Sequence, residues 1–250
     1  MATRLHVGAK ELKGDLAAYA KRFDLLEVRG ADAAHLKQAP SAATLRRWRR
    51  AAPPQFEFSV VAGPNVGKLK PGPAFDAELA AMLEAVEILR ARVMVLPTPS
   101  DVTPSKLWRD RVAKVLEKLP RDASSIVWEP SGLWENEDAA EQAAKWDVVL
   151  GVDPARDPMP KGPVAYGRLR AAGGTRAFST AALQKIADTI GERRDAYVLI
   201  ETASALKEAK TLRGLVRQLA SGGKKGGLGR LIRPKGAALE GLDDDEQEEE

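Results

Sequence analysis

The sequence predicts an α/β protein built as a (β/α)₈ TIM-like barrel in which one crossover lacks a helix. Short apolar runs recur eight times along the chain, and segments of helical period separate most of them. A length of 250 residues is also that of one complete barrel. Strands that alternate with helices at this spacing are typical of parallel βαβ units.

The expected elements follow in chain order. The eight runs read as strands are Leu5–Gly8, Leu25–Val28, Phe56–Val61, Val93–Leu96, Ser125–Trp128, Val148–Val152, Val164–Leu169 and Tyr197–Ile200. The segments with apolar residues three and four apart are Leu12–Arg22, Ala43–Arg50, Phe75–Arg90, Ser105–Leu119, Glu137–Lys145, Thr180–Gly191 and Ser204–Leu219. The candidate helix caps are Ser41, Asp101 or Thr103, Asn136, and Ser179 or Thr180.

Two further features of the sequence refine this expected architecture. Prolines crowd the stretch after Asp153, so the crossover between the sixth and seventh strands is expected to be a loop. An open doubly wound sheet is the alternative to a barrel, but Gly8-Ala9-Lys10-Glu11 after the first strand has none of the phosphate-loop patterns of such sheets. The closed barrel is therefore favoured.

Composition limits the available chemistry. The chain has no cysteine and only two histidines, His6 and His35, which excludes thiolate chemistry and argues against a multi-zinc site. We expect no metal centre and no cofactor, although carboxylates holding Mg²⁺ stay open as an alternative. His6 lies inside the first strand and is expected to be a core histidine.

The start of the chain lacks the apolar stretch of a secretory signal, and no run reaches the length of a membrane span, so we expect a cytoplasmic protein without a membrane partner.

The chain divides into a barrel domain, residues 1–220, and a tail, residues 221–250. The tail is a Gly/basic stretch followed by an acidic block, and its composition predicts flexibility. Residues 222–250 carry five basic and eight acidic side chains, so the rest of the chain has a net charge of +7 although the whole has +4. The tail could aid solubility, contact a partner, or cover a basic surface of its own barrel.

The barrel fold places an active site at the C-terminal ends of the strands. Glu27, Glu129 and Asp153 fall there and are the candidate catalytic carboxylates, suited to acid–base work. Arg168 and Arg170 alternate with Leu169 and so share one face of their strand. They form a candidate site for a phosphate or carboxylate, together with two further ligand-binding candidates, Tyr166 and Glu201. The alternative is that all these charges form structural ion pairs.

A series of stretches resembles one known family in order and spacing, over roughly residues 3–220. They are YAKRFDLLEVRG, TLRRW, PPQFEFSV, VLPTPSD, WEPSGLW, GVDP, YGRLR and AYVLIETASALKEAKTLRGLV. This pattern is similar to that of the YecE-like family, known as domain of unknown function 72. The resemblance implies a TIM barrel.

The chain departs from that family at polar positions. The family's basic stretch after the fifth strand is reduced to Glu129 and Trp134, with Pro130 between them. The histidine of its seventh strand is replaced at Arg170, and its Asn-rich eighth strand becomes Ile200-Glu201-Thr202. The resemblance therefore implies a diverged member, either a pseudoenzyme or a protein adapted to another ligand.

Three function classes stay open. The first is an enzyme, or its ligand-binding descendant, acting on a small anionic molecule at the barrel mouth. The second is a nucleic-acid-associated protein, indicated by the basic segment Leu45–Arg50 with Trp48 inside it. On an amphipathic helix, however, Leu45 and Trp48 would face the barrel and leave only a solvated row of arginines. The third is a protein-interaction scaffold.

Overall fold

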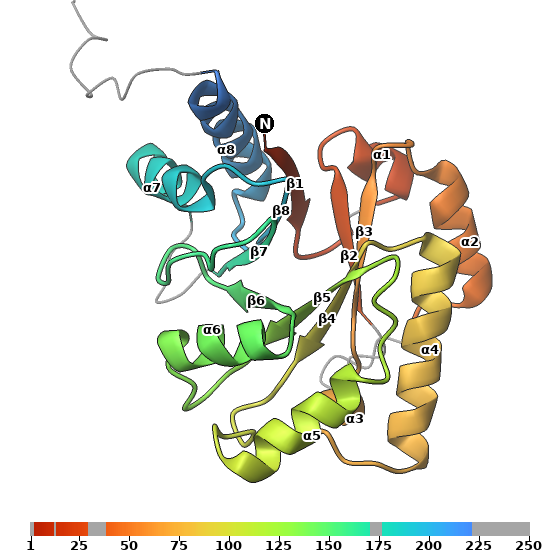
Figure 1. Ribbon diagram of the computed structural model, residues 1–250. Helices are drawn as coiled ribbons and strands as arrows, with labels where there is room; N and C mark the ends of the chain where they lie inside the picture. Colours follow the sequence, from red (N-terminus) through yellow and green to blue (C-terminus); the bar gives the residue numbers. More distant parts are fainter. Residues whose placement is uncertain (1–2, 13, 30–38, 171–176, 222–250) are drawn as a thin grey trace, which may run out of the picture.

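The computed structural model describes residues 3–12, 14–29, 39–170 and 177–221. Eight parallel strands surrounded by helices form a nearly closed barrel (Figure 1). The strands are β1 (Arg4–Ala9), β2 (Leu25–Arg29), β3 (Glu57–Val61), β4 (Val93–Pro97), β5 (Ser125–Glu129), β6 (Val149–Val152), β7 (Val164–Leu169) and β8 (Asp195–Ile200). The helices are α1 (Leu16–Ala20), α2 (Ala42–Ala51), α3 (Pro64–Gly67), α4 (Pro73–Leu89), α5 (Lys106–Leu116), α6 (Asn136–Lys145), α7 (Thr180–Ile190) and α8 (Ala205–Ala220).

The predicted fold class is confirmed, including the crossover without a helix between β6 and β7. Local chemistry explains several boundaries. Ser41 and Ser179 cap α2 and α7 as predicted, each accepting a hydrogen bond from a backbone N–H three residues on. The predicted start of the first helix at Leu12 is wrong: α1 begins at Leu16 because Asp15 caps it, accepting from the N–H of Ala18 at 2.7 Å.

Three other details differ from the prediction. Asn136 is the first residue of α6 and not its cap, since Glu135 occupies the capping position. Neither Asp101 nor Thr103 caps α5, because that helix begins at Lys106 and Ser105 occupies its capping position. The one-turn helix α3 was not predicted; it begins at Pro64, where proline is favoured because its missing N–H would have no partner in the first turn.

Seven of the eight strand interfaces are hydrogen-bonded ladders, in the order β1-β8-β7-β6-β5-β4-β3-β2. At the remaining seam, between β1 and β2, the N–H of Asp24 donates to the carbonyl of Val7 at 3.1 Å, and side chains supply the other hydrogen bonds. The Tyr19 hydroxyl accepts from the N–H of Ala9 and donates to the carbonyl of Leu25, both at 2.9 Å. A carboxylate oxygen of Asp24 accepts from the N–H of Val7 at 2.5 Å. Tyr19 and Asp24 thus take the place of ladder bonds.

The core has two layers that follow the period-two alternation of the strands. One set of side chains fills the barrel lumen: Leu25, Val61, Val93, Val95, Val127, Val164, Tyr166, Tyr197 and Leu199. The alternate positions pack outward against the helices, for example Phe58 of β3 and Trp128 of β5. The lumen is therefore filled by side chains. Its charged groups lie toward its ends, and the hydroxyl of Ser59, in the same register as Val61, is buried within it.

Some expectations concern residues outside the described ranges. His35 and residues 222–250, which include the predicted flexible tail, lie there. Among the helices of the described ranges, none is both long enough and apolar enough to cross a membrane.

Candidate functional site

The side chains predicted for the site meet at the C-terminal end of the lumen. Glu27 of β2, Glu129 of β5 and Arg168 of β7 occupy the lumen-facing register of their strands, one step beyond the apolar layer, and all three are buried. A glycine makes room for them. A Cβ at Gly151 of β6 would lie 2.6 Å from Cγ of Glu129, so a larger residue there would displace that carboxylate.

Arg168 is the centre of this group, and its five N–H donors all have carboxylate acceptors. Nε and Nη2 donate to the two oxygens of Glu129 at 2.9 and 3.0 Å. Nη1 and Nη2 donate to the two oxygens of Glu27 at 3.1 and 2.7 Å. Nη1 also donates to Glu201 at 3.0 Å. The guanidinium therefore has no N–H left over for a ligand.

Both carboxylate oxygens of Glu27 also accept hydrogen bonds from protein groups. One of its oxygens accepts from Arg168 and from Arg29 Nε at 2.8 Å; the other accepts from Arg168 and from the hydroxyl of Tyr166. Burial alone would raise the pKa of Glu27, but the positive charges of Arg168 and Arg29 outweigh it and lower this pKa to about 2. Glu27 is therefore ionised at neutral pH and cannot donate a proton there.

The same neighbours fix the protonation of the other two central groups. Burial and the adjacent Glu27 raise the pKa of the Tyr166 phenol well above its ordinary value, so it stays a hydrogen-bond donor. Burial would lower the pKa of Arg168, but the charges of Glu27 and Glu129 raise it, so the guanidinium stays charged. The centre is a fixed ion network with little capacity for proton transfer.

Two arginines extend this network to the surface. Arg29 bonds to Glu27, and Arg170 Nη2 lies 3.6 Å from Glu129; their side chains are 49% and 53% exposed, against 2% for Arg168. Each is thus bonded on one side and open to solvent on the other. Arg29 was not predicted as a site residue, although its position two residues after Glu27 on the same strand face was a usable signal.

Asp153 behaves differently from the other predicted carboxylates. Its side chain is 6% exposed, and its nearest side-chain cation, Arg156, is 4.0 Å away. Burial raises the pKa of Asp153, opposed by the backbone hydrogen bond from Ala155. Among the carboxylates predicted as catalytic, it is the one whose pKa shifts toward neutrality, which is the direction required of a general acid or base.

A cavity of about 420 Å³ adjoins the network between the ends of β1 and β8. Glu201 lines it and bonds to Arg168 on its other side, while the exposed Lys10 lines it from β1. Because β8 lies between β7 and β1 in the barrel, Arg170, Glu201 and Lys10 follow one another around the rim with alternating charge.

The remaining candidates lie apart from this end of the barrel or lack the needed geometry. His6 is partly buried; it stacks on Tyr197 with ring centroids 4.9 Å apart and lies 3.7 Å from Asp195, at the N-terminal end of the strands. In α2, Leu45 is buried and Trp48, which is partly buried, packs against the core, while Arg46, Arg47 and Arg50 are exposed. In the described ranges, no group of three or more His, Cys, Asp or Glu side chains is arranged to hold a metal ion.

The fold and the site together define a single (β/α)₈ barrel with a carboxylate–arginine network at its C-terminal mouth. The chain belongs to the family described as protein of unknown function DUF72, which matches residues 6–230. This confirms the resemblance noted in the sequence. No curated protein matches the chain.

Solved structures agree with the assignment. A DUF72 family protein from Thermotoga maritima is 16% identical, with a TM-score of 0.62, and the match covers 87% of this chain and 99% of that one. A DUF72 family protein from Enterococcus faecalis is 14% identical, with a TM-score of 0.62, covering 94% and 100%. A xylose isomerase domain-containing protein from Salmonella typhimurium is 12% identical, with a TM-score of 0.55, covering 88% and 97%. These likenesses concern the fold.

Proposed function

We propose that the protein binds a small anionic ligand, carrying a phosphate or carboxylate group, at the C-terminal mouth of the barrel. The observation that carries the proposal is the contrast among three arginines of one network. Arg168 has all its donors bound to protein carboxylates, whereas Arg29 and Arg170 present half-exposed guanidinium groups at the rim. Arg170 is then the group that contacts the anion, and a guanidinium fork suits phosphate or carboxylate.

Arg168 acts as a positioning residue in this proposal. It holds Glu129, which in turn faces Arg170, and it holds Glu201, which lines the adjoining cavity. Glu201 would accept a hydrogen bond from a ligand hydroxyl while the anionic group lies on Arg170. The ligand class is therefore a hydroxylated anion such as a sugar phosphate or a hydroxy acid.

Asp153 is the residue through which binding could become catalysis. Its raised pKa and its place at the end of β6, next to β7, make it the candidate general base. Glu27 and Glu129 are instead assigned to holding Arg168. Two structural neighbours carry sugar-enzyme names, a xylose isomerase domain-containing protein and a D-tagatose 3-epimerase-like protein. They are only 12% and 13% identical to this chain, so the proposed ligand class is argued from the charged residues at the barrel mouth and not from these names.

The test is a thermal-shift and calorimetric titration with inorganic phosphate, citrate and a set of sugar phosphates. A ligand that binds only the folded state raises its melting temperature. Arg170→Ala should weaken binding of any anion that stabilises the wild type by tenfold or more, since a charge-assisted pair is worth roughly 1.5–3 kcal/mol. Arg46→Ala is the matched control, because it removes the same charge from the exposed face of α2.

Two results would reject the proposal. One is that no anion raises the wild-type melting temperature. The other is that Arg170→Ala and Arg46→Ala bind the anion equally well, which would place it elsewhere. If Arg46→Ala alone lost binding, the basic face of α2 would be the anion site, as the nucleic-acid hypothesis requires.

A further inference from the structure

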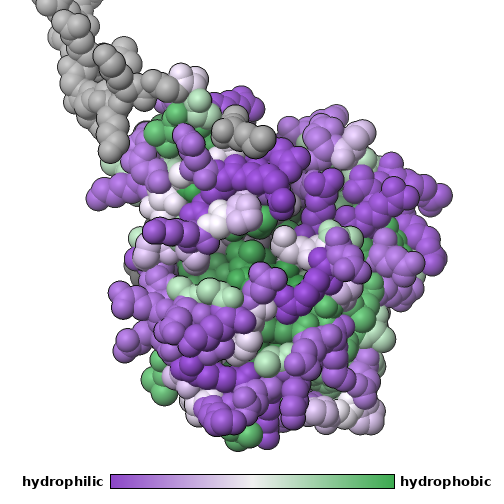
Figure 2. Space-filling view, in the orientation of Figure 1, coloured by the Kyte–Doolittle hydropathy of each residue, from purple (hydrophilic) through white to green (hydrophobic). Residues whose placement is uncertain are grey.

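The loop crossover between β6 and β7 leaves a groove in the barrel wall. β6 pairs with β7 only through Gly151 with Tyr166 and Val152 with Gly167, so the first residues of β7, Val164 and Ala165, have no β6 partner. A groove of about 490 Å³ opens there. Figure 2 shows hydrophobic side chains gathered in the hollow at the middle of this face, with hydrophilic ones around them.

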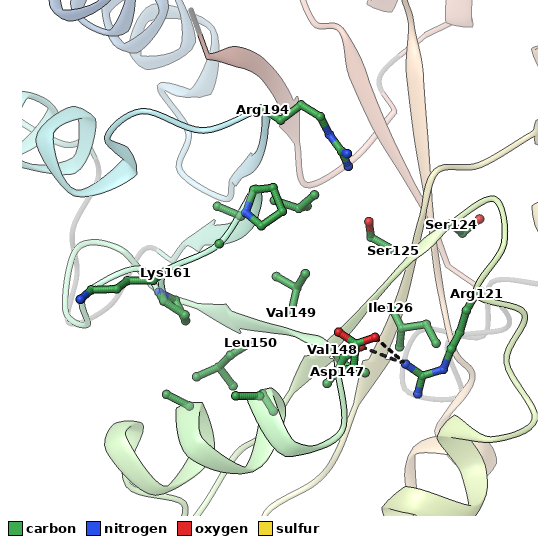
Figure 3. A pocket seen from close by; sticks show the side chains of 18 residues that line it. Arg121, Ser124, Ser125, Ile126, Asp147, Val148, Val149, Leu150, Lys161 and Arg194 are labelled. Atoms are coloured by element: carbon green, nitrogen blue, oxygen red, sulfur yellow. Dashed lines mark hydrogen bonds and ion pairs between the residues drawn. The ribbon is translucent and has the colours of Figure 1, made fainter. Parts of the chain in front are cut away.

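The floor of the groove is apolar and its rim is basic. Ile126, Val149 and Leu150 lie on the floor, and Lys161, Arg121 and Arg194 stand around them (Figure 3). A helix would cover such a floor in a regular barrel. Here the described residues leave it open.

At the N-terminal end of the strands the groove continues into a second cavity, of about 530 Å³. The two cavities share Arg121 and Arg194, and the second adds Arg4 and Arg92. Four guanidinium groups from different parts of the chain therefore converge there, against two lining carboxylates, Asp122 and Asp195. We refer to Arg4, Arg92, Arg121 and Arg194 as the arginine quartet.

Four carboxylates lie near the quartet, but they accept only some of its N–H groups. Arg92 Nε is 3.6 Å from Glu57, too far for a hydrogen bond. Arg4 and Arg194 share the single carboxylate of Asp195, at 2.8 and 2.9 Å. Arg121 donates to the backbone carbonyls of Trp146 and Asp147, which carry no net charge, and the Asp147 carboxylate is 3.7 Å away and fully exposed. In the described residues, the quartet therefore keeps N–H donors that no carboxylate accepts, and an acidic group entering the cavity would find donors there.

The chain itself carries such a group, and the described part of the chain before it ends at the same end of the barrel. α8 runs back to the N-terminal ends of the strands, where its Arg213 bonds to the carbonyl of Arg22 and to Asp24, just before β2. Beyond Ser221 come 29 residues that end in DDDEQEEE, with seven acidic side chains in the last eight positions, preceded by AALEGL. The 21 residues between Ser221 and the acidic block can span up to about 75 Å, which is more than enough to reach the quartet.

We propose that the acidic segment 243–250 docks on the arginine quartet of its own barrel and that the preceding AALEGL, residues 237–242, lies in the apolar groove. The apolar and acidic parts are adjacent in the chain, as the groove and the cavity are in the structure, where they share Arg121 and Arg194. The tail then takes the place of the missing helix and covers the basic end of the barrel.

Cross-linking tests this directly, because the chain has no cysteine of its own. Gln247→Cys places a thiol in the acidic segment without changing its charge. Ala123→Cys is exposed and lines the quartet cavity just before β5, while Leu133→Cys, 72% exposed, follows the opposite end of β5. In the full chain, a short bifunctional thiol reagent should link Gln247→Cys to Ala123→Cys at least fivefold more than to Leu133→Cys.

The same two cysteine pairs test whether docking depends on the acidic charge of the segment. The preference should fall to no more than twofold when the seven acidic residues are replaced by their amides, and also in about 0.5 M salt, where exposed charges are screened. Equal linkage to both ends of β5 would overturn the proposal, as would a preference that survives both changes. Linkage between chains in place of linkage within one would also overturn it, and would show that the segment binds a second copy.

Discussion

Glu27 and Arg168, 141 residues apart in the chain, face each other through two parallel hydrogen bonds of 3.1 and 2.7 Å in the buried centre of the barrel. Tyr166 and Glu129 complete the surroundings of this pair. Such an arrangement is costly to break from one side, since the partner is left as an uncompensated buried charge. The pair therefore behaves as part of the core.

Arg168→Met should lower the free energy of unfolding by roughly 3–5 kcal/mol, because it leaves buried carboxylates without their counter-ion. Arg168→Lys should recover only part of this loss, since an ammonium group cannot form two parallel pairs of bonds. Chemical denaturation measures both variants. Arg170→Met, at the exposed rim, is the control and should lose less than about 1 kcal/mol. Equal losses at the two positions would refute the structural role of Arg168.

The low pKa of Glu27 predicts a dependence of stability on pH. A carboxyl with an ordinary pKa near 4.5 in the unfolded chain and about 2 in the folded one stabilises the fold above pH 4.5, and this contribution disappears as the pH falls toward 2. At about 1.4 kcal/mol per pKa unit, the contribution is roughly 3 kcal/mol. The difference in unfolding free energy between wild type and Glu27→Gln should therefore shrink between pH 5 and pH 2. Glu84→Gln, on the exposed side of α4, should follow the wild type throughout; a constant gap for Glu27→Gln would contradict the assignment.

Tyr19→Phe tests the seam between β1 and β2. It removes one hydroxyl and leaves the N–H of Ala9 and the carbonyl of Leu25 without this partner. Each unsatisfied buried group costs about 1–3 kcal/mol, so the melting temperature should fall by several degrees. Tyr197→Phe makes the same chemical change at a hydroxyl that lines the open quartet cavity, and it should change stability by less than half as much. If both variants melt alike, the hydroxyl of Tyr19 does not close the seam.

Gly151→Ala should lower the stability of the fold, because it adds one methyl group beside Glu129. The added carbon would lie 2.6 Å from Cγ of Glu129 and 3.0 Å from Cγ1 of Val127, and such overpacking costs about 1–3 kcal/mol. Gly214→Ala is the opposite case, because a Cβ there meets nothing within 4 Å and the residue lies inside α8. It should raise stability by up to about 1 kcal/mol. Thermal melts of the two variants should move in opposite directions, and a neutral Gly151→Ala would mean that Glu129 has room to shift.

The barrel could be predicted from sequence because its signals are local. Alternating apolar positions in runs such as Val164–Leu169 define a strand regardless of its partners, and the prolines after Asp153 exclude a helix by their own chemistry. The first helix was placed too early because the capping side chain of Asp15 outweighs the apolar period that begins at Leu12.

The internal arrangement of the site could not be predicted in the same way. Register and strand order bring Glu27, Glu129 and Glu201 to one guanidinium, and no single stretch of sequence carries that information. The sequence indicated Arg168 as a direct ligand contact and left structural ion pairs as the alternative. In the structure, every N–H donor of Arg168 is hydrogen-bonded to a carboxylate, so the proposed ligand contact is Arg170.

The ladder between β1 and β8 has a consequence for the order of events during translation. β1 leaves the ribosome first, yet its ladder partner spans Asp195–Ile200 and is made about 190 residues later. At the usual 5–20 residues per second this is a wait of roughly 10–40 s. During that interval β1 has only Tyr19 and Asp24 to attach it to β2, while each strand from β3 to β7 can join its predecessor as soon as it emerges. The nascent chain therefore carries an exposed first strand until its last strand is complete.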